Sequence, residues 1–497
     1  MSISKTIFLD YLYCPKNMWL KLHKPVLLEK FQLSDFEKHL MQQGNEVESC
    51  ARNLFPGGIA VSSNGEGACH ETVRLMDSKM PTIFQATFIV DGFIARNDML
   101  SFNKVTGVWD LYEVKGGNSV KEHDADHSHI DDVAFQVSVL KRVGVPLGSY
   151  YIVHLNKEYV RSGDLDIPKL FIVEDKTEEV KAVLDGVEKQ MAAAREYLNR
   201  AEEPLGSCEC VYRGRKKHCA TFQYSNSHVP EYSVHDISYI SQKKLNLLIE
   251  GGIFDLKDIP EEFALSENQR NQILAHERQE PIIDKGSIKD ILGKLSFPLY
   301  FFDYEAYGPA IPAFNGFSPY KRIPFQFSLH ILKSPTSKPE HVEFLHEDLS
   351  DPSEHVGRIL KENFVPGGTF IAWHKSYEAG VNDEIALRLP QYKELFGKIN
   401  DSLYDLKEIF TAQHYIHPDF RGKTSIKKVL PAIVPDLRYG DINIREGGQA
   451  ADAWWTMVSS LISPESKQTI IKDLKTYCGL DTYAMYAIWK HLYDITL

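Results

Sequence analysis

Acidic and basic side chains gather on one predicted strand and on the strand before it. Glu113 and Lys115 are two positions apart in the β-like run 108–115, so they project from the same face of a strand. Asp98 lies at the end of the preceding run, and Gln136 lies one turn into the following helical segment. Two carboxylates can bind a divalent ion, while an ammonium orients a water molecule and offsets charge on a phosphate. The alternative interpretation is a partly exposed ion pair between neighbouring strands.

A second set of acids is spread over the C-terminal part of the chain. Asp303 and Glu305 are two positions apart at the end of an apolar run, and Glu378 follows a later apolar run. Tyr477 and Asp481 are four positions apart, so they project together from a helix. Four acids suit a phosphodiesterase with two ions about 3.5–4 Å apart, and a tyrosine hydroxyl beside them can orient the attacking water. The alternative is a scatter of surface acids.

Four of the seven cysteines can form one group. Cys208, Cys210 and Cys219 fall within twelve residues, and Cys14 lies far upstream. Four thiolates suit zinc or an iron–sulfur cluster, which would join the start of the chain to the end of its domain. The alternative is a set of buried free cysteines. Basic residues of two segments are candidate phosphate contacts, with solvated charge as the alternative: Arg213, Arg215, Lys216, Lys217, Arg421 and Lys423.

Two α/β patterns must position these residues. The first combines strand-like and helical runs, with strands expected at 83–90, 93–100, 108–115 and 149–155 and helices at 132–143 and 181–200. Polar residues from 225 onward and a helical stretch over 236–278 indicate a connector, which is either a backbone-gripping helical pair or a small spacer. The second pattern starts at Pro298 and continues mainly as helices after strands at 299–303, 325–332 and 369–374.

Length, charge and hydropathy exclude several classes of protein. At 497 residues the chain has room for about three domains. Its 56 basic and 68 acidic residues give a net charge of −12, which argues against a protein that coats polyanions but agrees with carboxylate metal sites. No apolar run approaches the ~20 residues of a membrane span, and the start has no apolar stretch of signal-peptide length. We therefore expect a cytoplasmic protein with reduced thiols and no membrane partner.

The first constellation resembles a known nuclease signature. Asp98, the Glu113–Lys115 pair and Gln136, with their neighbours at 96–100, 112–115 and 132–136, resemble the D…ExK…Q pattern of PD-(D/E)XK nucleases of the RecB-like branch. The resemblance implies that Asp98 and Glu113 bind metal and that Lys115 and Gln136 are catalytic. Many RecB-like nucleases have a histidine ligand after the first helix, and Glu48 stands at about that place as its substitute.

The cysteines and the second acidic set also resemble known families. The cysteine arrangement is similar to that of iron–sulfur members of the RecB-like nucleases, which implies a 4Fe–4S cluster, with zinc as the alternative. The pattern Asp303-x-Glu305, a later acid, and Tyr477-x3-Asp481 resembles the DEDDy exonucleases, which are ribonuclease-H-like. That resemblance implies 3′–5′ cleavage with Mg²⁺ or Mn²⁺ on the four acids and a catalytic tyrosine; Glu378 stands where an aspartate is usual.

Nearly the whole chain resembles a bacterial family that combines both nuclease types. We therefore predict an α/β protein with a RecB-like nuclease domain at 1–224, a helical, helix-hairpin-helix-like connector at 225–295, and a ribonuclease-H-like, mixed-sheet exonuclease domain at 296–497. The predicted function is metal-dependent cleavage of DNA, single-stranded or at ends, in processing, repair or defence. The alternatives are an RNA 3′–5′ exonuclease and a nucleic-acid-binding scaffold with a degenerate first site and a structural cysteine cluster. No P-loop motif occurs, so any unwinding would require a helicase partner.

Overall fold

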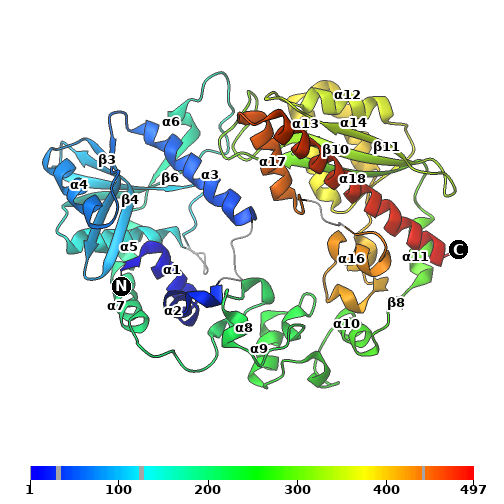
Figure 1. Ribbon diagram of the computed structural model, residues 1–497, viewed down its shortest axis with the longest axis horizontal. Helices are drawn as coiled ribbons and strands as arrows, with labels where there is room; N and C mark the ends of the chain where they lie inside the picture. The colour runs from blue at the N-terminus through cyan, green and yellow to red at the C-terminus, as the bar shows by residue number, and fades with distance from the viewer. Residues whose placement is uncertain (1, 29–34, 123–127, 439–442) are drawn as a thin grey trace. The chain divides into compact units, whose positions relative to one another are not determined.

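The computed structural model describes residues 2–28, 35–122, 128–438 and 443–497, which form two compact units (Figure 1). The first unit comprises Met1–His228 together with Pro309–Tyr320, and the second comprises Val229–Gly308 and Lys321–Leu497. From Val229 onward, the segment expected to be a separate connector therefore belongs to the second unit. Of the histidine-rich loop 123–129, which the sequence predicts to be solvated, residues 123–127 lie outside the described residues.

A seven-stranded sheet organises the first unit. Strand β1 (Ile3–Ser4) pairs with β4, and the remaining strands follow the order β2 (Ile59–Ala60), β3 (Thr82–Val90), β4 (Phe93–Asn103), β5 (Val108–Lys115), β6 (Leu147–Leu155) and β7 (Phe171–Asp175). Strands β3, β4 and β5 are antiparallel, and β6 is parallel to β5. The pairing of β4 with β5 ends at Met99 and Tyr112, so Asp98 and Glu113 lie just beyond the last paired residues.

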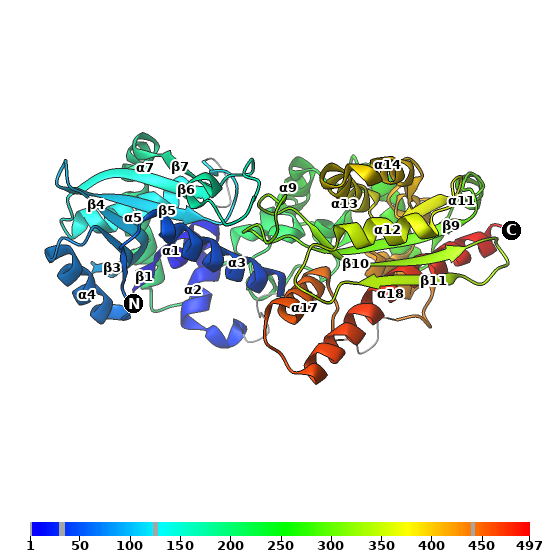
Figure 2. The same ribbon diagram turned by 90° about the horizontal axis from the view of Figure 1, so that it is seen from above.

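Helices cover both faces of this sheet (Figure 2). Helix α5 (His129–Arg142) connects β5 to β6, and its Phe135 stacks on Phe8 of α1 (Lys5–Tyr13). Helix α7 (Thr177–Leu198) packs on α5, and α4 (Gly65–Asp77) packs on β3. Helix α3 (Asp35–Ala51) covers the opposite face, where Val47 packs against Phe84. The Ser128 side chain caps α5 by accepting from the Asp131 amide at 3.3 Å, so the helix starts about two turns before Gln136. The remaining helices are α2 (Pro15–His23), α6 (Ile167–Leu170) and α8 (Phe222–Ser225).

The second unit contains a five-stranded mixed sheet. Its order is β11 (Glu340–Leu345), β10 (Ile323–Leu332), β9 (Leu299–Tyr307), β12 (Thr369–Ala372) and β13 (Leu403–Asp405). The first three strands are antiparallel, whereas β12 is parallel to β9 and β13 is parallel to β12. The predicted strands at 299–303, 325–332 and 369–374 are confirmed, with β9 continuing to Tyr307, β10 starting at Ile323 and β12 ending at Ala372. A separate pair joins β8 (Ile282–Ile283) and β14 (Tyr415–Ile416).

Alternation along β9 decides which helix meets its acids. Tyr300 and Phe302 point into the core formed with α12 (Ser353–Asn363), α13 (Lys375–Arg388) and α14 (Lys393–Asp401). Phe301 points to the other face, where α16 (Ile426–Ile433) and α18 (Pro464–Ile495) pack. Asp303 and Glu305 share that second face with Phe301, because side chains alternate along a strand. The other helices are α9 (Gln242–Glu250), α10 (Glu267–Arg278), α11 (Lys285–Leu292), α15 (Glu408–Thr411) and α17 (Gly447–Ser459).

Helix α18 is 32 residues long, but length alone does not make a membrane span. Its sequence carries charged residues throughout, and its buried side contacts β9, β10 and the helices of the same unit. Across the residues that the structure describes, no helix combines the length and the apolar character needed to cross a membrane.

Candidate metal and catalytic sites

Three carboxylates of the second unit converge on one point. Asp303 and Glu305 of β9 and Asp481 of α18 each offer an oxygen, and these ligand atoms lie within 4.8 Å of one another. Glu305 and Asp481 are 7% and 8% exposed, so their charges are largely removed from water. Carboxylate oxygens are the preferred ligands of hard divalent cations. The arrangement fits a metal centre of the kind that the residue types predict.

Burial and mutual repulsion make it unfavourable for all of these carboxylates to be ionised at once. Burial, followed by the charge of Asp481, raises the pKa of Glu305 to about 8. The same two causes raise the pKa of Asp303 well above its ordinary value. The thiol of Cys478 adds no charge, since burial also raises its pKa well above the ordinary value. The centre therefore retains protons until a cation replaces them.

Glu378 stands next to this triad but is not part of it. It lies in the first turn of α13 and is 3% exposed. Burial raises the pKa of Glu378 to about 8, and its charge in turn contributes to the raised pKa of Asp303. Among the described atoms, its Oε2 has no hydrogen-bond partner. A buried carboxylate oxygen without a partner is costly unless it binds a ligand, so Glu378 fits the role of a further metal ligand.

Two other side chains complete the immediate surroundings. Tyr477, one turn before Asp481 on α18, is 4% exposed, and the Lys427 ammonium lies 5.4 Å from the centre of its ring. On the side of Glu378, the Arg322 guanidinium lies 5.1 Å from the centre of the Tyr377 ring. Arg322 lowers the pKa of Glu378, against the larger effect of burial. Lys427 and Arg322 thus bring positive charge to the edge of the carboxylates.

The raised pKa values predict a pH dependence of stability for the metal-free protein. Glu305 and Glu378 have a pKa of about 8 in the folded chain and about 4.3 when unfolded, so the folded state binds more protons between these values. The free energy of unfolding should therefore fall as pH rises from about 5 to about 8.5. Thermal melts in EDTA across this range measure it, and Glu305→Gln should flatten the fall. Mn²⁺ should restore stability most at high pH; a melting temperature that rises with pH equally in both proteins would contradict this.

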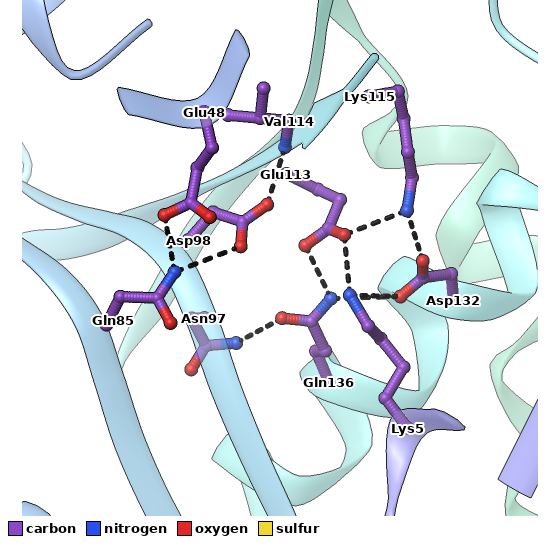
Figure 3. A network of polar contacts seen from close by, with 10 residues as sticks. All are labelled: Lys5, Glu48, Gln85, Asn97, Asp98, Glu113, Val114, Lys115, Asp132 and Gln136. Atoms are coloured by element: carbon purple, nitrogen blue, oxygen red, sulfur yellow. Dashed lines mark hydrogen bonds and ion pairs between the residues drawn. The ribbon is translucent and has the colours of Figure 1, made fainter. Parts of the chain in front are cut away.

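Two of the predicted residues of the first unit, Glu113 and Lys115, form a ring of ion pairs with Lys5 and Asp132 (Figure 3). Lys115 Nζ lies 2.8 Å from Glu113 Oε1 and also pairs with Asp132. Lys5 Nζ lies 2.7 Å from Glu113 Oε1 and 3.2 Å from Asp132 Oδ1. Gln136 donates to Glu113 Oε2 at 2.7 Å, so both oxygens of Glu113 are engaged. Two ammoniums and two carboxylates neutralise one another in a buried site.

The ring fixes the protonation of its members. Burial by itself would raise the pKa of Glu113, but Lys115 and Lys5 hold it below its ordinary value. Burial opposes charge on Lys115 as well, yet Asp132 and Glu113 raise its pKa above the ordinary value. Lys115 therefore stays protonated at neutral pH. It can offer a positive charge and orient water, but it is not set up to accept a proton.

Asp98 and Glu48 meet on the other side of Glu113. Gln85 Nε2 donates to Glu48 Oε1 at 2.5 Å and is 3.4 Å from Asp98 Oδ1, so the amide lies between the two carboxylates (Figure 3). Asp98 also accepts the Val114 amide at 2.9 Å. Burial and the charge of Glu113 raise the pKa of Asp98 well above its ordinary value. Within the described part of the chain, however, the acids here form no set of three as close as that of the second unit.

Several members of the first site escaped sequence analysis. Asp132 lies four residues before Gln136 on α5, and this spacing is a signal that could have identified it. Gln85 adopts a left-handed φ of 56° in β3, which no sequence pattern announces. Lys5 comes from the first turn of α1 and meets Glu113 across 108 residues of sequence. No local spacing can reveal a contact of that range.

The four predicted cysteines come together in the first unit. Cys14 separates α1 from α2, whereas Cys208, Cys210 and Cys219 follow α7, and their Sγ atoms lie within 4.8 Å of one another. All four thiols are buried and none forms a disulfide. Hydrogen bonds within the group raise the pKa of Cys14 and Cys219 and lower the pKa of Cys208 and Cys210. Such a group fits a metal that accepts several thiolates.

The predicted basic residues lie in two places. Arg213 packs its guanidinium 4.1 Å from the centre of the Tyr13 ring, so it braces the cysteine region. Arg215 is half-buried in the same loop, and Lys216 and Lys217 are exposed. In the second unit, Lys423 is exposed, while Arg421 pairs with Glu231 at 2.8 Å. The loop 213–217 therefore presents positive charge to solvent, and Arg421 is engaged within its own unit.

The chain is thus a protein of two mixed α/β units, one with a carboxylate centre and one with a four-cysteine group. Residues 300–425 match a domain of unknown function, DUF2779. The chain is 25% identical over 225 residues to an uncharacterised protein of Mycoplasma genitalium, covering 42% of this chain and 34% of the relative. It is 24% identical over 220 residues to an uncharacterised protein of Ureaplasma parvum, covering 40% and 32%. The chain thus spans about one third of the length of these relatives. The matched domain includes Asp303, Glu305 and Glu378 and ends before Asp481.

Proposed function

We propose that this chain is a metal-dependent nuclease whose second unit removes nucleotides from 3′ ends. The observation that carries the proposal is the buried triad of Asp303, Glu305 and Asp481, with ligand oxygens within 4.8 Å of one another. The unpartnered oxygen of Glu378 supplies the fourth acid of the DEDDy pattern, and Tyr477 lies one turn from Asp481. The mixed sheet that carries the first two acids agrees with a ribonuclease-H-like fold.

The residues of the second site divide into three roles. Bound Mg²⁺ or Mn²⁺ would activate water and stabilise the leaving oxygen of a phosphodiester. Asp303, Glu305 and Asp481 hold the positive charge in place, and Glu378 completes the set from α13. The Tyr477 hydroxyl would orient the attacking water. Because the acids are buried, a vacant centre takes up protons, and a cation that binds there replaces them.

We propose a RecB-like nuclease core for the first unit, with Glu48, Asp98 and Glu113 as metal ligands. The carboxylates of Glu48 and Asp98 are joined by the Gln85 amide, and Glu48 Oε1 also pairs with Arg52 at 2.7 Å, so a cation bound there would replace these contacts. Lys115, held protonated, would offset the charge of the phosphate, and Gln136 fixes Glu113. A second candidate function is a nucleic-acid-binding unit without cleavage. The observation that favours it is the engagement of both Glu113 oxygens by Lys5, Lys115 and Gln136.

The cysteine group is proposed as a metal site that joins the start of the first unit to its end. An iron–sulfur cluster is what the RecB-like resemblance implies. The sulfur spacing, however, also suits a single ion: Cys208 and Cys219 are 3.8 Å apart, and the edge of a tetrahedron with bonds of about 2.3 Å is about 3.8 Å. The exposed lysines of the adjoining loop are proposed phosphate contacts. DNA ends are the proposed substrate, and RNA is the competing one.

A time course on end-labelled single- and double-stranded DNA and RNA, with Mg²⁺ or Mn²⁺, tests the proposal. The wild type should shorten strands from the 3′ end, and the ladder should start at the label-distal end for 5′-labelled substrates. EDTA should stop the reaction, because the acids alone provide no activated water. Absence of metal-dependent cleavage on all four substrates would exclude the nuclease function.

Lys115→Met separates the two proposed roles of the first unit. If the first unit cleaves, the variant should lower the activity of that unit at least about 100-fold and leave the 3′ exonuclease activity unchanged, since the residues lie in different units. Cleavage of circular single-stranded DNA, which has no 3′ end, measures the first unit alone. Lys104→Met, at an exposed turn of the same unit, is the matched control. Equal behaviour of both variants on every substrate would favour the binding function.

A further inference from the structure

Lys427 brings a positive charge to the carboxylate centre of the second unit. It is the second residue of α16, whose apolar side packs Val429 and Leu430 into the core shared with α18. The Lys427 side chain itself is exposed, and its ammonium lies 5.4 Å from the centre of the buried Tyr477 ring. From the sequence, Lys427 is equally consistent with a solvated helix face. The structure places it beside the one tyrosine that the proposed chemistry uses.

The charge of Lys427 acts on the acids of the centre. It lowers the pKa of both Asp303 and Glu305, although burial and the neighbouring carboxylates outweigh it. Its Nζ also donates to the carbonyl oxygen of Arg445, just before α17. The first residue of α17, Gly447, abuts the centre, because a Cβ there would lie 3.4 Å from Glu305 Oε2. Lys427 therefore stands where α16, α17 and α18 meet around the acids.

We propose that Lys427 binds a phosphate of the nucleic-acid strand, the one next to the bond that is cleaved, and thereby positions that bond against Tyr477. The inference rests on the proposed exonuclease function. The cleaved phosphate itself belongs at the metal ligands, and Lys427 lies at their edge, on the tyrosine side. A phosphate oxygen is a stronger partner for an ammonium than the neutral carbonyl of Arg445. A lysine is suited to this exchange because its charge is compact and its stem is flexible.

The test removes the charge from the protein and from the strand in turn. Lys427→Met keeps the apolar stem, and Lys428→Met changes the adjacent exposed lysine of the same helix as the matched control. Both are assayed on a strand with normal linkages and on one with a neutral methylphosphonate at the linkage next to the 3′-terminal one. On the normal strand, Lys427→Met should lower kcat/KM about 100-fold, and Lys428→Met should change it less than about 2-fold. Lys427→Arg should recover part of the loss.

On the strand with the methylphosphonate, the wild type should lose about as much kcat/KM as Lys427→Met loses on the normal strand. On that neutral strand, Lys427→Met should lower kcat/KM only slightly further. The reason is that both changes remove the same contact, so their effects do not multiply. Mn²⁺ binding by Lys427→Met should stay near normal, which separates lost phosphate binding from a damaged centre. If the effects of Lys427→Met and of the methylphosphonate multiply, or if Lys428→Met loses as much activity as Lys427→Met, the assignment is overturned. A wild type without Asp303-dependent cleavage would overturn the exonuclease function itself, whereas cleavage indifferent to Lys427 would overturn only this inference.

Discussion

Asp303→Asn should abolish metal-dependent removal of nucleotides from 3′ ends, with a fall in kcat of at least about 1,000-fold. Asparagine has nearly the same shape as aspartate but lacks its charge, so the centre loses one of three ligands that lie within 4.8 Å of one another. Repulsion among buried carboxylates falls at the same time. The metal-free variant should therefore be at least as stable as the wild type, and thermal melts together with Mn²⁺ titration distinguish lost chemistry from lost folding.

The matched control is Asp401→Asn, which removes an exposed carboxylate of the same unit. It should leave both rate and melting temperature unchanged. Tyr477→Phe forms an intermediate case, because it keeps the ring and loses only the hydroxyl: the rate should fall while Mn²⁺ binding stays near normal. An active Asp303→Asn beside an inactive Tyr477→Phe would contradict the mechanism. Cleavage from 5′ ends that survives Asp303→Asn would assign the chemistry to the first unit.

Cys208→Ser should remove bound metal from the first unit and lower its free energy of unfolding by at least about 3 kcal/mol. Metal binding to four thiolates is coupled to folding, because the ligands come together only in the folded chain. Here one ligand precedes α2 and three follow α7, so the site closes the first unit on itself. Metal analysis and absorbance of anaerobically purified protein, followed by thermal melts, measure both effects.

Cys69→Ser provides the control, since Cys69 is a free, half-buried cysteine outside the group. It should retain full metal content and stability. Iron with a brown colour would support the iron–sulfur cluster that the resemblance implies. Stoichiometric zinc without iron would replace that identity and keep the site, in line with the 3.8 Å separation of the Cys208 and Cys219 sulfurs. Anaerobic protein with neither metal would exclude both.

Sequence patterns predicted the parts of the fold that depend on local periodicity. Strand β5 begins and ends where the alternation of residues 108–115 places it, and α18 presents Tyr477 and Asp481 one turn apart. Strand β11 was not predicted, because only Val342 and Phe344 alternate on its core side and the strand is largely exposed, and β13 is only three residues long. The spacing of side chains along one helix or strand can thus be predicted from the local sequence. The pairing of strands at a sheet edge cannot, because it depends on residues that are distant in the chain.

The same limit applies to the candidate sites. The acids of β9 and the cysteines were identifiable because their types and spacing suit metals, and the structure brings Asp303, Glu305 and Asp481 together. The environment of each site was not identifiable. Lys5 reaches Glu113 only because β1 docks on β4 and sets the start of α1, and Lys427 reaches Tyr477 only because α16 packs on α18. Tertiary packing, not spacing, selects these neighbours.

The segment Pro309–Tyr320 belongs to the first unit, although it connects two strands of the second. Arg161 of the first unit binds the carbonyl oxygens of Pro312 and Ala313 at 2.9 and 2.8 Å, and Ala310 is fully buried in its core. The polypeptide consequently passes between the units three times, and no single cut separates them. A fragment ending at residue 228 would lack part of its own interior, and one starting at 229 would carry an unsupported apolar loop. Neither unit is therefore a module that can be cut out of the chain at one boundary.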